Sequence, residues 1–464
     1  QHRFLFSACR IPGDPQDTAR TPYTDAWPGP SRERHVVVLH RGRAFRMDVV
    51  GPEGRPHVPG ELEDGLRRVV AASGAEAPGP SVGPLTTTAR AAWARSRERL
   101  RALDARNAAT LDDIETALFC VCLEHEQPED VVAAGTGLLA GDSRNRWFDK
   151  SVSFVVHPDG TAGYNGEHCR LDGTTVIAMI DAVLGRTAAE HADASGARPQ
   201  GSPAVRPLDL VLDDGLRADV QDAHEAFCAY AASTATAAVA LDFDSERAKR
   251  LGVSPDAFAQ LTFQLAHRRA TGHLGATYES IATRTFRHGR TEAMRVVTDE
   301  IAAFVEAMGD PEATAGGRRA ALRAAAAAHV ARARECQAGR APEQHLWALQ
   351  MLQGRRGAAL GVPGPSALFD SPGWRILRDD VLSTSAVPSV NVRYWGFGST
   401  SERCIGVAYA LLPDRFRLFL STPRPVAGAM EAFAAALPVV VAELEALLEG
   451  DVPPAGPRGV HPSR

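Results

Sequence analysis

A short loop in the first half of the chain carries the residues best suited to move a proton. His168 is followed four residues later by Asp172 and then by Gly173, an H-x-x-x-D-G arrangement. Imidazole has an unperturbed pKa of about 6.5, so it accepts and returns a proton near neutral pH. Asp172 can brace the loop while the imidazole points into a cleft, which favours general base catalysis. Taken alone, a histidine after a strand is more often a packed or solvated residue.

A second unusual block lies just before that loop. Residues 145–150 read Asn-Arg-Trp-Phe-Asp-Lys, and a strand is expected to follow at 151–157, before a turn at 158–160. We expect this strand to help position the loop that carries His168. We expect Lys150, at the base of the strand, to be structural.

The rest of the chain indicates mixed α/β structure without a fixed-period repeat. Further strands are expected at 35–39, 404–412 and 416–422. The last two are joined by Pro413-Asp414, a turn pair, and therefore predict a hairpin.

The clearest helix is expected over 255–271. Ser254 is its N-cap, Pro255 stands at its first position, and Gly272 lies just past its end. Its apolar face is formed by Phe258, Leu261 and Leu265. The other expected helices cover 91–103, 215–232, 320–337 and 427–448, and Pro438 should interrupt the last one.

The length of 464 residues favours two domains, because a single hydrophobic core rarely grows that large. Residues 191–207 are rich in Ala, Ser, Gly and Pro and show no periodicity, so they are the best candidate for a connection. The sequence thus predicts domains over 1–205 and 206–464. A second Gly/Pro-rich loop at 77–84 is treated as internal.

Charge and composition exclude several classes of protein. The net charge is -5 and no block of five or six like charges occurs, so nucleic-acid binding and a basic membrane patch are not expected. No membrane-spanning run of eighteen apolar residues and no signal pattern is seen. The seven cysteines, without a C-x-x-C pair, fit a reduced compartment. These features predict a cytoplasmic protein.

Lysine is rare in this chain. Of 51 Lys and Arg residues, only Lys150 and Lys249 are lysines, and long alanine runs accompany this skew. Such a composition is typical of GC-rich coding and predicts a bacterial source.

Five sequence blocks, in order, resemble the choline/carnitine O-acyltransferase family, which moves acyl groups between coenzyme A and a small alcohol. The active-site block at 145–173 is one of them. The other four lie at 6–13 (FSACRIPG), 254–258 (SPDAF), 276–291 (ATYES, Arg284 and GRT) and 382–388 (LSTS before Val387-Pro388).

The resemblance implies a fold and a mechanism. The fold is two α/β sandwich domains like chloramphenicol acetyltransferase, with an active-site tunnel between them. In this scheme the N-terminal domain carries His168 as general base. Ser385 donates a hydrogen bond to the oxyanion. Asp172 and Arg290 brace the site.

The resemblance also places coenzyme A and the acceptor on the C-terminal domain. Lys249 falls on one of two basic positions expected to meet the 3'-phosphate, and Ser245 stands at the other, so coenzyme A binding is expected to be weakened unless nearby arginines compensate. The implied contacts to coenzyme A or its pantetheine arm are Lys249, Arg250, Asp256, Glu279 and Ser383.

Acceptor recognition departs from the family pattern. Tyr278, Ser280 and Thr291 match the residues that hold the carboxylate of carnitine. The arginine that pairs with this carboxylate is replaced by Gln344, which supplies neither its charge nor its bidentate donor fork. We therefore expect a small hydroxyl acceptor other than carnitine.

The acyl side is marked by two aromatic residues. Trp395 falls, by count from Ser385, where bulk limits acyl length, and Phe397 follows it, so a short acyl group is expected. The family's helical segment ahead of residues 6–13 has no counterpart here, which predicts a shortened form or a piece of a longer chain.

Two alternatives stay open from the sequence. The acyl group can come from a phosphopantetheine thioester on an acyl carrier protein, as in related condensation domains, or the fold can serve as a catalytically silent binding protein. No permanently bound cofactor is expected. No metal is expected either, because residues 124–126 (Glu-His-Glu), which could be taken for metal ligands, indicate an exposed turn. We expect a monomer.

Overall fold

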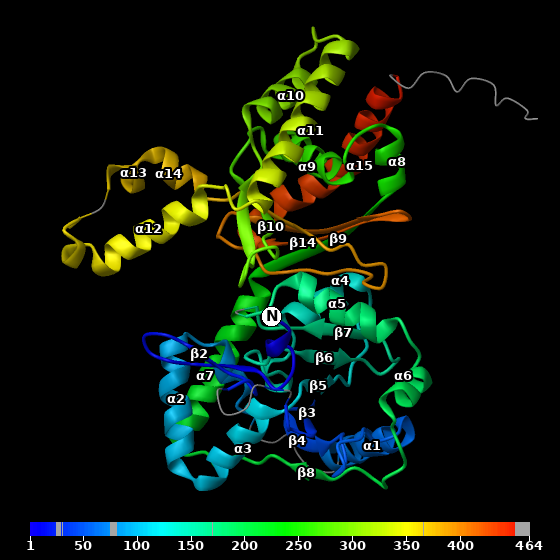
Figure 1. The fold of residues 1–464 in the computed structure, drawn as a ribbon, viewed down its shortest axis with the longest axis vertical. Coiled ribbons are helices and arrows are strands. Elements are labelled where there is room, and N and C mark those ends of the chain that lie inside the picture. The colour runs from blue at the N-terminus through cyan, green and yellow to red at the C-terminus, as the bar shows by residue number, and fades with distance from the viewer. Residues whose placement is uncertain (25–28, 30, 75–80, 169, 365, 451–464) are drawn as a thin grey trace, which may run out of the picture. The chain divides into compact units, whose positions relative to one another are not determined.

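The computed structural model describes residues 1–464 except 25–28, 30, 75–80, 169, 365 and 451–464. The chain forms two compact units, Gln1–Thr234 and Ala235–Arg464, called unit 1 and unit 2 below. Each unit is built around one six-stranded mixed sheet (Figure 1).

The sheet of unit 1 has the order β7-β6-β5-β3-β4-β8. Strands β6, β5 and β3 are parallel, and the outer pairs β7–β6, β3–β4 and β4–β8 are antiparallel. Its strands are β3 (His35–His40), β4 (Arg43–Asp48), β5 (Cys120–Leu123), β6 (Ser153–Val156), β7 (Ala162–Asn165) and β8 (Val205–Pro207). A separate pair joins β1 (Cys9–Ile11) to β2 (Thr18–Arg20).

Helices cover both faces of this sheet, because β3 is buried on both sides. Val37 and Leu39 pack in a core with Leu100 of α2 and Leu111 of α3, whereas Val38 packs on the opposite face with Val69 of α1. The helices of unit 1 are α1 (Pro59–Gly74), α2 (Arg90–Leu103), α3 (Ala105–Thr116), α4 (Val131–Ala140), α5 (Gly173–Leu184), α6 (Ala188–Ser195) and α7 (Asp214–Ala232).

The sheet of unit 2 repeats the pairing pattern of unit 1. In the order β11-β10-β12-β13-β14-β9, the inner strands β10, β12 and β13 are parallel and are flanked by antiparallel β11 and β14. The strands are β9 (Thr234–Leu241), β10 (Thr277–Ala282), β11 (Thr291–Arg295), β12 (Leu382–Ala386), β13 (Ile405–Leu412) and β14 (Arg415–Pro423). The predicted fold class, an α/β chain with two similar sheets, is confirmed.

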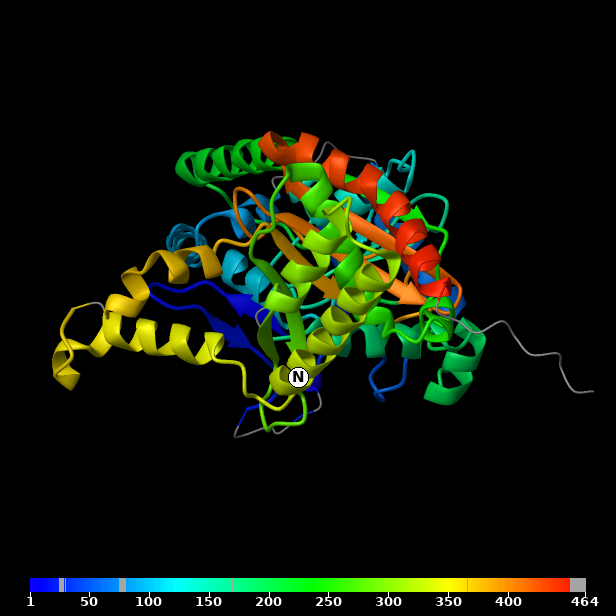
Figure 2. The same ribbon diagram turned by 90° about the horizontal axis from the view of Figure 1, so that it is seen from above.

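Most helices of unit 2 fall into two groups in Figures 1 and 2. α9, α10, α11 and α15 lie together over the sheet, and α12 to α14 form an arm that extends from it. Their bounds are α8 (Ser245–Arg250), α9 (Pro255–Thr271), α10 (Asp299–Gly309), α11 (Ala315–Gln337), α12 (Glu343–Arg356), α13 (Ala367–Asp370), α14 (Pro372–Leu377) and α15 (Ala427–Glu449).

Helix α9 matches its predicted bounds. Pro255 stands at its first position, and Gly272 ends it in the left-handed conformation, with φ of 81°. The predicted apolar face is buried, but so is every residue over 257–267, because α10, α11 and α15 enclose the helix as well as the sheet.

Helix α15 corrects one prediction. Pro438 lies inside it and does not interrupt it. One face packs into the core through residues on both sides of the proline, including Phe433, Leu437 and Val441, which holds the helix together despite the missing N–H. By length and composition, residues 424–449 also suffice to cross a membrane, but one such helix is weak evidence, because core helices of proteins pass the same test.

The other predicted elements match well. Strands expected at 35–39, 151–157, 404–412 and 416–422 are β3, β6, β13 and β14, and the last two form the predicted hairpin. Helix α11 begins five residues before its expected start. The stretch at 191–207, expected to connect two domains, contains β8, which pairs with β4 of unit 1.

Candidate active site

His168 lies in the loop between β7 and α5. Its Nδ1 hydrogen-bonds the backbone carbonyl of Leu171. Since a carbonyl only accepts, Nδ1 carries the proton, and in the neutral imidazole Nε2 is left as the basic nitrogen. The side chain is 75% exposed, so this nitrogen belongs to an accessible ring.

Asp172 stabilises the loop that carries His168 through contacts with His168 and Gln1. Its carboxylate is buried, and its Oδ1 lies 4.0 Å from His168 Nδ1, an electrostatic contact rather than a hydrogen bond. Gln1 Nε2 donates to its Oδ2 at 2.5 Å, and Gln1 Oε1 accepts from the Asp172 backbone N–H at 2.9 Å. Cys169, within the same loop, lies outside the described residues.

A chain of ion pairs links the loop to the start of the chain. Glu167, next to His168, accepts from Arg10 Nη1 at 3.2 Å, and Arg10 Nε donates to Asp17 at 2.5 Å. Asp17 also accepts from Arg90 Nε at 2.7 Å. The block at 6–13 is therefore tied to the histidine loop by charge.

The block at 145–150 joins the same network. Two nitrogens of Arg90 donate to the Asp149 carboxylate, at 2.7 and 3.2 Å. Trp93 Nε1 donates to the same carboxylate at 2.8 Å. Burial raises the pKa of Asp149 to about 6. Lys150 is fully buried and donates to two carbonyls at the end of α3, at 3.1 and 2.9 Å, which confirms its structural role.

Two serines come together on neighbouring strands of unit 2. β10 and β12 run parallel, with Tyr278 beside Ser383 and Glu279 beside Thr384, so Ser280 lies beside Ser385. Their hydroxyl oxygens are 3.2 Å apart. Because side chains alternate along a strand, Glu279 and Thr384 point to the opposite face. Ser383 is buried, whereas Ser385 is half-buried.

Tyr278 pairs with Arg295 of β11, and its side chain also reaches Thr291 at the start of that strand. Burial raises the pKa of Tyr278 to about 12, although a hydrogen bond with Thr291 and the charge of Arg295 act against it. The Arg295 guanidinium is 5.9 Å from the tyrosine ring and ion-pairs with Glu343 and Asp380. The sequence did not indicate Arg295, because its two acidic partners lie far along the chain.

Arg290 precedes β11 in the turn between β10 and β11. Its carbonyl accepts from the Thr283 N–H at 2.9 Å. At the neighbouring Gly289, an added Cβ would meet the Thr283 carbonyl oxygen at 1.9 Å, so only glycine fits this turn. The turn thereby fixes where Arg290 and Thr291 begin β11.

Gln344 lies in the first turn of α12, on the arm of unit 2. It is half-buried and lines a groove of about 390 Å³. The other lining residues are Trp347, Ala348, Met351, Leu352 and Arg355. Apolar side chains of α12 therefore continue the groove from Gln344.

Lys249 and Arg250 are exposed at the end of the short helix α8. Lys249 Nζ contacts Glu246 Oε1 at 2.7 Å. Arg247 turns away to ion-pair with Glu445 and Asp242. Ser245, at the second expected basic position, is buried.

Asp256 and Glu279 meet two residues that the sequence reasoning did not single out, His329 of α11 and Tyr409 of β13. Tyr409 Oη lies 2.6 Å from Asp256 Oδ1 and 3.3 Å from Glu279 Oε1. His329 Nε2 lies 3.1 Å from Asp256 Oδ2. No sequence signal could have found His329, because it lies within an alanine-rich helix 50 residues from Glu279.

Trp395 and Phe397 lie in the segment between β12 and β13. Trp395 Nε1 donates to the Tyr409 carbonyl at 3.2 Å, and the two aromatic rings are 5.5 Å apart. Since Tyr409 pairs with Ala386, the indole is anchored one residue along from Ser385.

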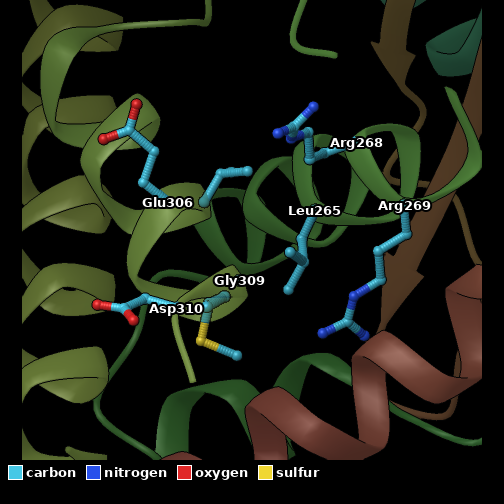
Figure 3. Close-up of a pocket in the computed structure, with 8 residues that line it drawn as sticks. Leu265, Arg268, Arg269, Glu306, Gly309 and Asp310 are labelled. Carbon is cyan, nitrogen blue, oxygen red and sulfur yellow. The ribbon is translucent and has the colours of Figure 1, made fainter. Parts of the chain in front are cut away.

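A pocket of about 300 Å³ lies elsewhere in unit 2, between the ends of α9 and α10 (Figure 3). It is lined by Leu265, Arg268, Arg269, Val305, Glu306, Met308, Gly309 and Asp310. None of the site residues predicted from the sequence lines it.

Some of the predicted site residues thus come together in two groups. Unit 1 brings His168 and Asp172 together in one loop. In unit 2, β10, β11 and β12 bring together the Tyr278–Thr291 pair and the Ser280–Ser385 pair. A basic side chain braced on an accessible loop and a hydroxyl pair on a sheet are typical parts of a group-transfer enzyme.

Comparison with known proteins identifies the family. Residues 1–438 match the model of the choline/carnitine O-acyltransferase family. The chain is 32% identical over 423 residues to mitochondrial carnitine O-palmitoyltransferase 2 of Mus musculus, covering 89% of this chain and 61% of that protein. It is 33% identical over 404 residues to the peroxisomal carnitine O-octanoyltransferase of Homo sapiens, covering 85% and 64%. The chain belongs to the choline/carnitine O-acyltransferase family.

The chain spans less than two thirds of the length of these relatives. Among solved structures, it is similar to the epimerization domain of tyrocidine synthetase B, with 11% identity, a TM-score of 0.37, and 70% and 80% of the two chains covered. The condensation enzyme VibH matches with 13% identity and a TM-score of 0.35, over 65% and 72%.

Proposed function

We propose that this chain transfers a short acyl group between coenzyme A and a small hydroxyl acceptor other than carnitine. The observation that carries the proposal is the hydrogen bond from His168 Nδ1 to the Leu171 carbonyl. It assigns the basic lone pair to Nε2 of an exposed ring, which is what a general base needs.

In the proposed reaction, His168 Nε2 removes the proton of the acceptor hydroxyl as the oxygen attacks the thioester carbonyl. The carbonyl becomes a tetrahedral oxyanion, to which the Ser385 hydroxyl donates a hydrogen bond. The C–S bond then breaks, and the proton held on Nε2 passes to the departing thiolate. The ester and free coenzyme A result, with no acyl-enzyme.

The acceptor assignment rests on charge. Gln344 is neutral, and Arg295, which pairs with Tyr278 across the strands, is already ion-paired with Glu343 and Asp380. A substrate carboxylate at the Tyr278–Thr291 pair would therefore find no uncommitted charge among these residues, which disfavours carnitine. A neutral or cationic alcohol fits this environment better.

The donor assignment rests on α8. Lys249 and Arg250 are exposed and can reach a phosphate. The buried hydroxyl of Ser245 replaces a cation at this helix. This replacement favours, as a second candidate, a phosphopantetheine thioester on an acyl carrier protein, which has no 3'-phosphate to bind.

Both assignments can be tested together. Purified protein is given acetyl-coenzyme A, or the same acyl group on a phosphopantetheinylated carrier protein, with a pool that includes carnitine, choline and neutral alcohols. Mass spectrometry of the products identifies donor and acceptor. We expect esters of non-carnitine alcohols, whereas acetylcarnitine as the main product would contradict the acceptor assignment.

A further inference from the structure

The cluster formed by Asp256, Glu279 and His329 points to a function beyond acyl transfer. We propose that these three residues form a binding site for a divalent transition metal of the zinc type. The site would be built entirely within unit 2, from the start of α9, the middle of β10 and α11.

The geometry of the three ligand atoms matches such an ion. His329 Nε2 lies 3.1 Å from Asp256 Oδ2 and 3.8 Å from Glu279 Oε2, and the ligand atoms of the three residues all lie within 4.8 Å of one another. Tetrahedral zinc with N and O ligands at about 2.1 Å has ligand-to-ligand edges of about 3.4 Å. The two distances from His329 Nε2 bracket this value.

Each carboxylate is already oriented for this role. Tyr409 Oη contacts Asp256 Oδ1 and Glu279 Oε1, at 2.6 and 3.3 Å, and so leaves Oδ2 and Oε2 facing the histidine. Carboxylates that bind metals are commonly held by a second hydrogen bond of this kind. The single proton of the tyrosine hydroxyl would therefore orient Asp256, at the shorter distance, while the hydroxyl oxygen packs against Glu279 Oε1.

A second, independent observation is a buried carboxylate oxygen in this cluster that has no hydrogen-bond partner among the described residues. Glu279 is 3% exposed, and its Oε2 has no hydrogen-bond partner among the described residues. A buried oxygen without a partner is costly, and coordination of a cation by Oε2 removes that cost.

Charge balance favours a divalent ion. Two carboxylates, those of Asp256 and Glu279, share this site, and their ligand oxygens lie within 4.8 Å of each other. A divalent cation between them neutralises the negative charge of both carboxylates. The Asp256 side chain is 40% exposed, which leaves the ion a route of entry.

The test measures metal binding without substrates, so its outcome is independent of whether acyl transfer occurs. The full chain is stripped with a chelator and titrated with Zn²⁺ by calorimetry and with Co²⁺ by visible absorption. We expect one equivalent per chain. Glu279→Gln and His329→Gln should each weaken binding by more than about 100-fold, since even outer partners of metal ligands change affinity by 10–100-fold.

His267→Gln is the matched control, because His267 is equally buried in unit 2 but lies outside the cluster and should leave binding unchanged. Circular dichroism checks that every variant folds, and two variants at different ligands guard against one that does not. Absence of stoichiometric binding by the unsubstituted chain would overturn the proposal. Binding that survives both Glu279→Gln and His329→Gln would overturn it as well.

Discussion

The hydroxyl oxygen of Ser280 lies 3.2 Å from that of Ser385, across the parallel strands β10 and β12. This contact joins two sequence blocks that lie 105 residues apart. It means that the proposed oxyanion donor has a neighbouring hydroxyl that can accept its hydrogen bond before the substrate binds and be displaced by the developing charge.

Ser385→Ala should therefore lower kcat by about 100-fold or more, which is typical for the loss of one oxyanion donor. KM for the acceptor should change little, because the bond forms only as charge develops. Steady-state kinetics of both serine variants check this. Ser280→Ala should have the smaller effect on kcat, and the reverse order would contradict the assignment of Ser385 as donor.

Gln344→Arg should restore recognition of a carboxylate. A guanidinium at this position adds a charge and a bidentate donor fork, and hydrogen bonds to charged groups contribute about 1.5–3 kcal/mol. We expect KM for carnitine to fall by about 10-fold or more. Gln350→Arg, on the same helix, is the control for added charge alone, and an equal fall there would count against the role of position 344.

Lys249→Ala should raise KM for acyl-coenzyme A by about 5-fold, since an exposed ion pair contributes at most about 1 kcal/mol. The same substitution should leave KM for the dephospho form, which lacks the 3'-phosphate, unchanged. Kinetics with the two donors separate a phosphate contact from a general effect. Equal KM changes for both donors would indicate that Lys249 is a solvated surface charge that does not contact the 3'-phosphate.

Acid should destabilise unit 2 through His267. Burial lowers the pKa of this histidine to about 4, below the ordinary value of 6.5. Between these values the unfolded chain binds the proton and the folded chain does not, so the free energy of unfolding falls as the pH drops from about 6.5 to about 4. Denaturant unfolding across this range should show a shallower pH slope for His267→Gln.

The local features of this fold could be predicted from the sequence. The bounds of α9 follow from Pro255 and Gly272, and the β13–β14 hairpin follows from its turn, because these signals act over a few residues. In helix α15, by contrast, the local signal of Pro438 led to a wrong prediction. Tertiary packing of Leu437 and Val441 outweighs the local penalty of Pro438, and a local pattern does not contain that packing.

The candidate site likewise has one part that the sequence indicates and another part that only the folded structure reveals. The H-x-x-x-D-G spacing pointed to His168 and Asp172, which share one loop. It contained no sign that Leu171 supplies the carbonyl that sets the tautomer. The partners of Arg295 and the position of His329 depend on strands and helices that meet from distant parts of the chain, so only the folded structure reveals them.

The most direct test of the central claim is thiol release from acyl-coenzyme A by the His168→Ala variant. His125→Ala, which removes another exposed histidine of unit 1, is the matched control. If His168 is the general base, its loss should lower the rate of thiol release by about 1,000-fold while the control keeps the unsubstituted rate. Equal rates for His168→Ala and the unsubstituted chain would contradict the mechanism proposed for this site.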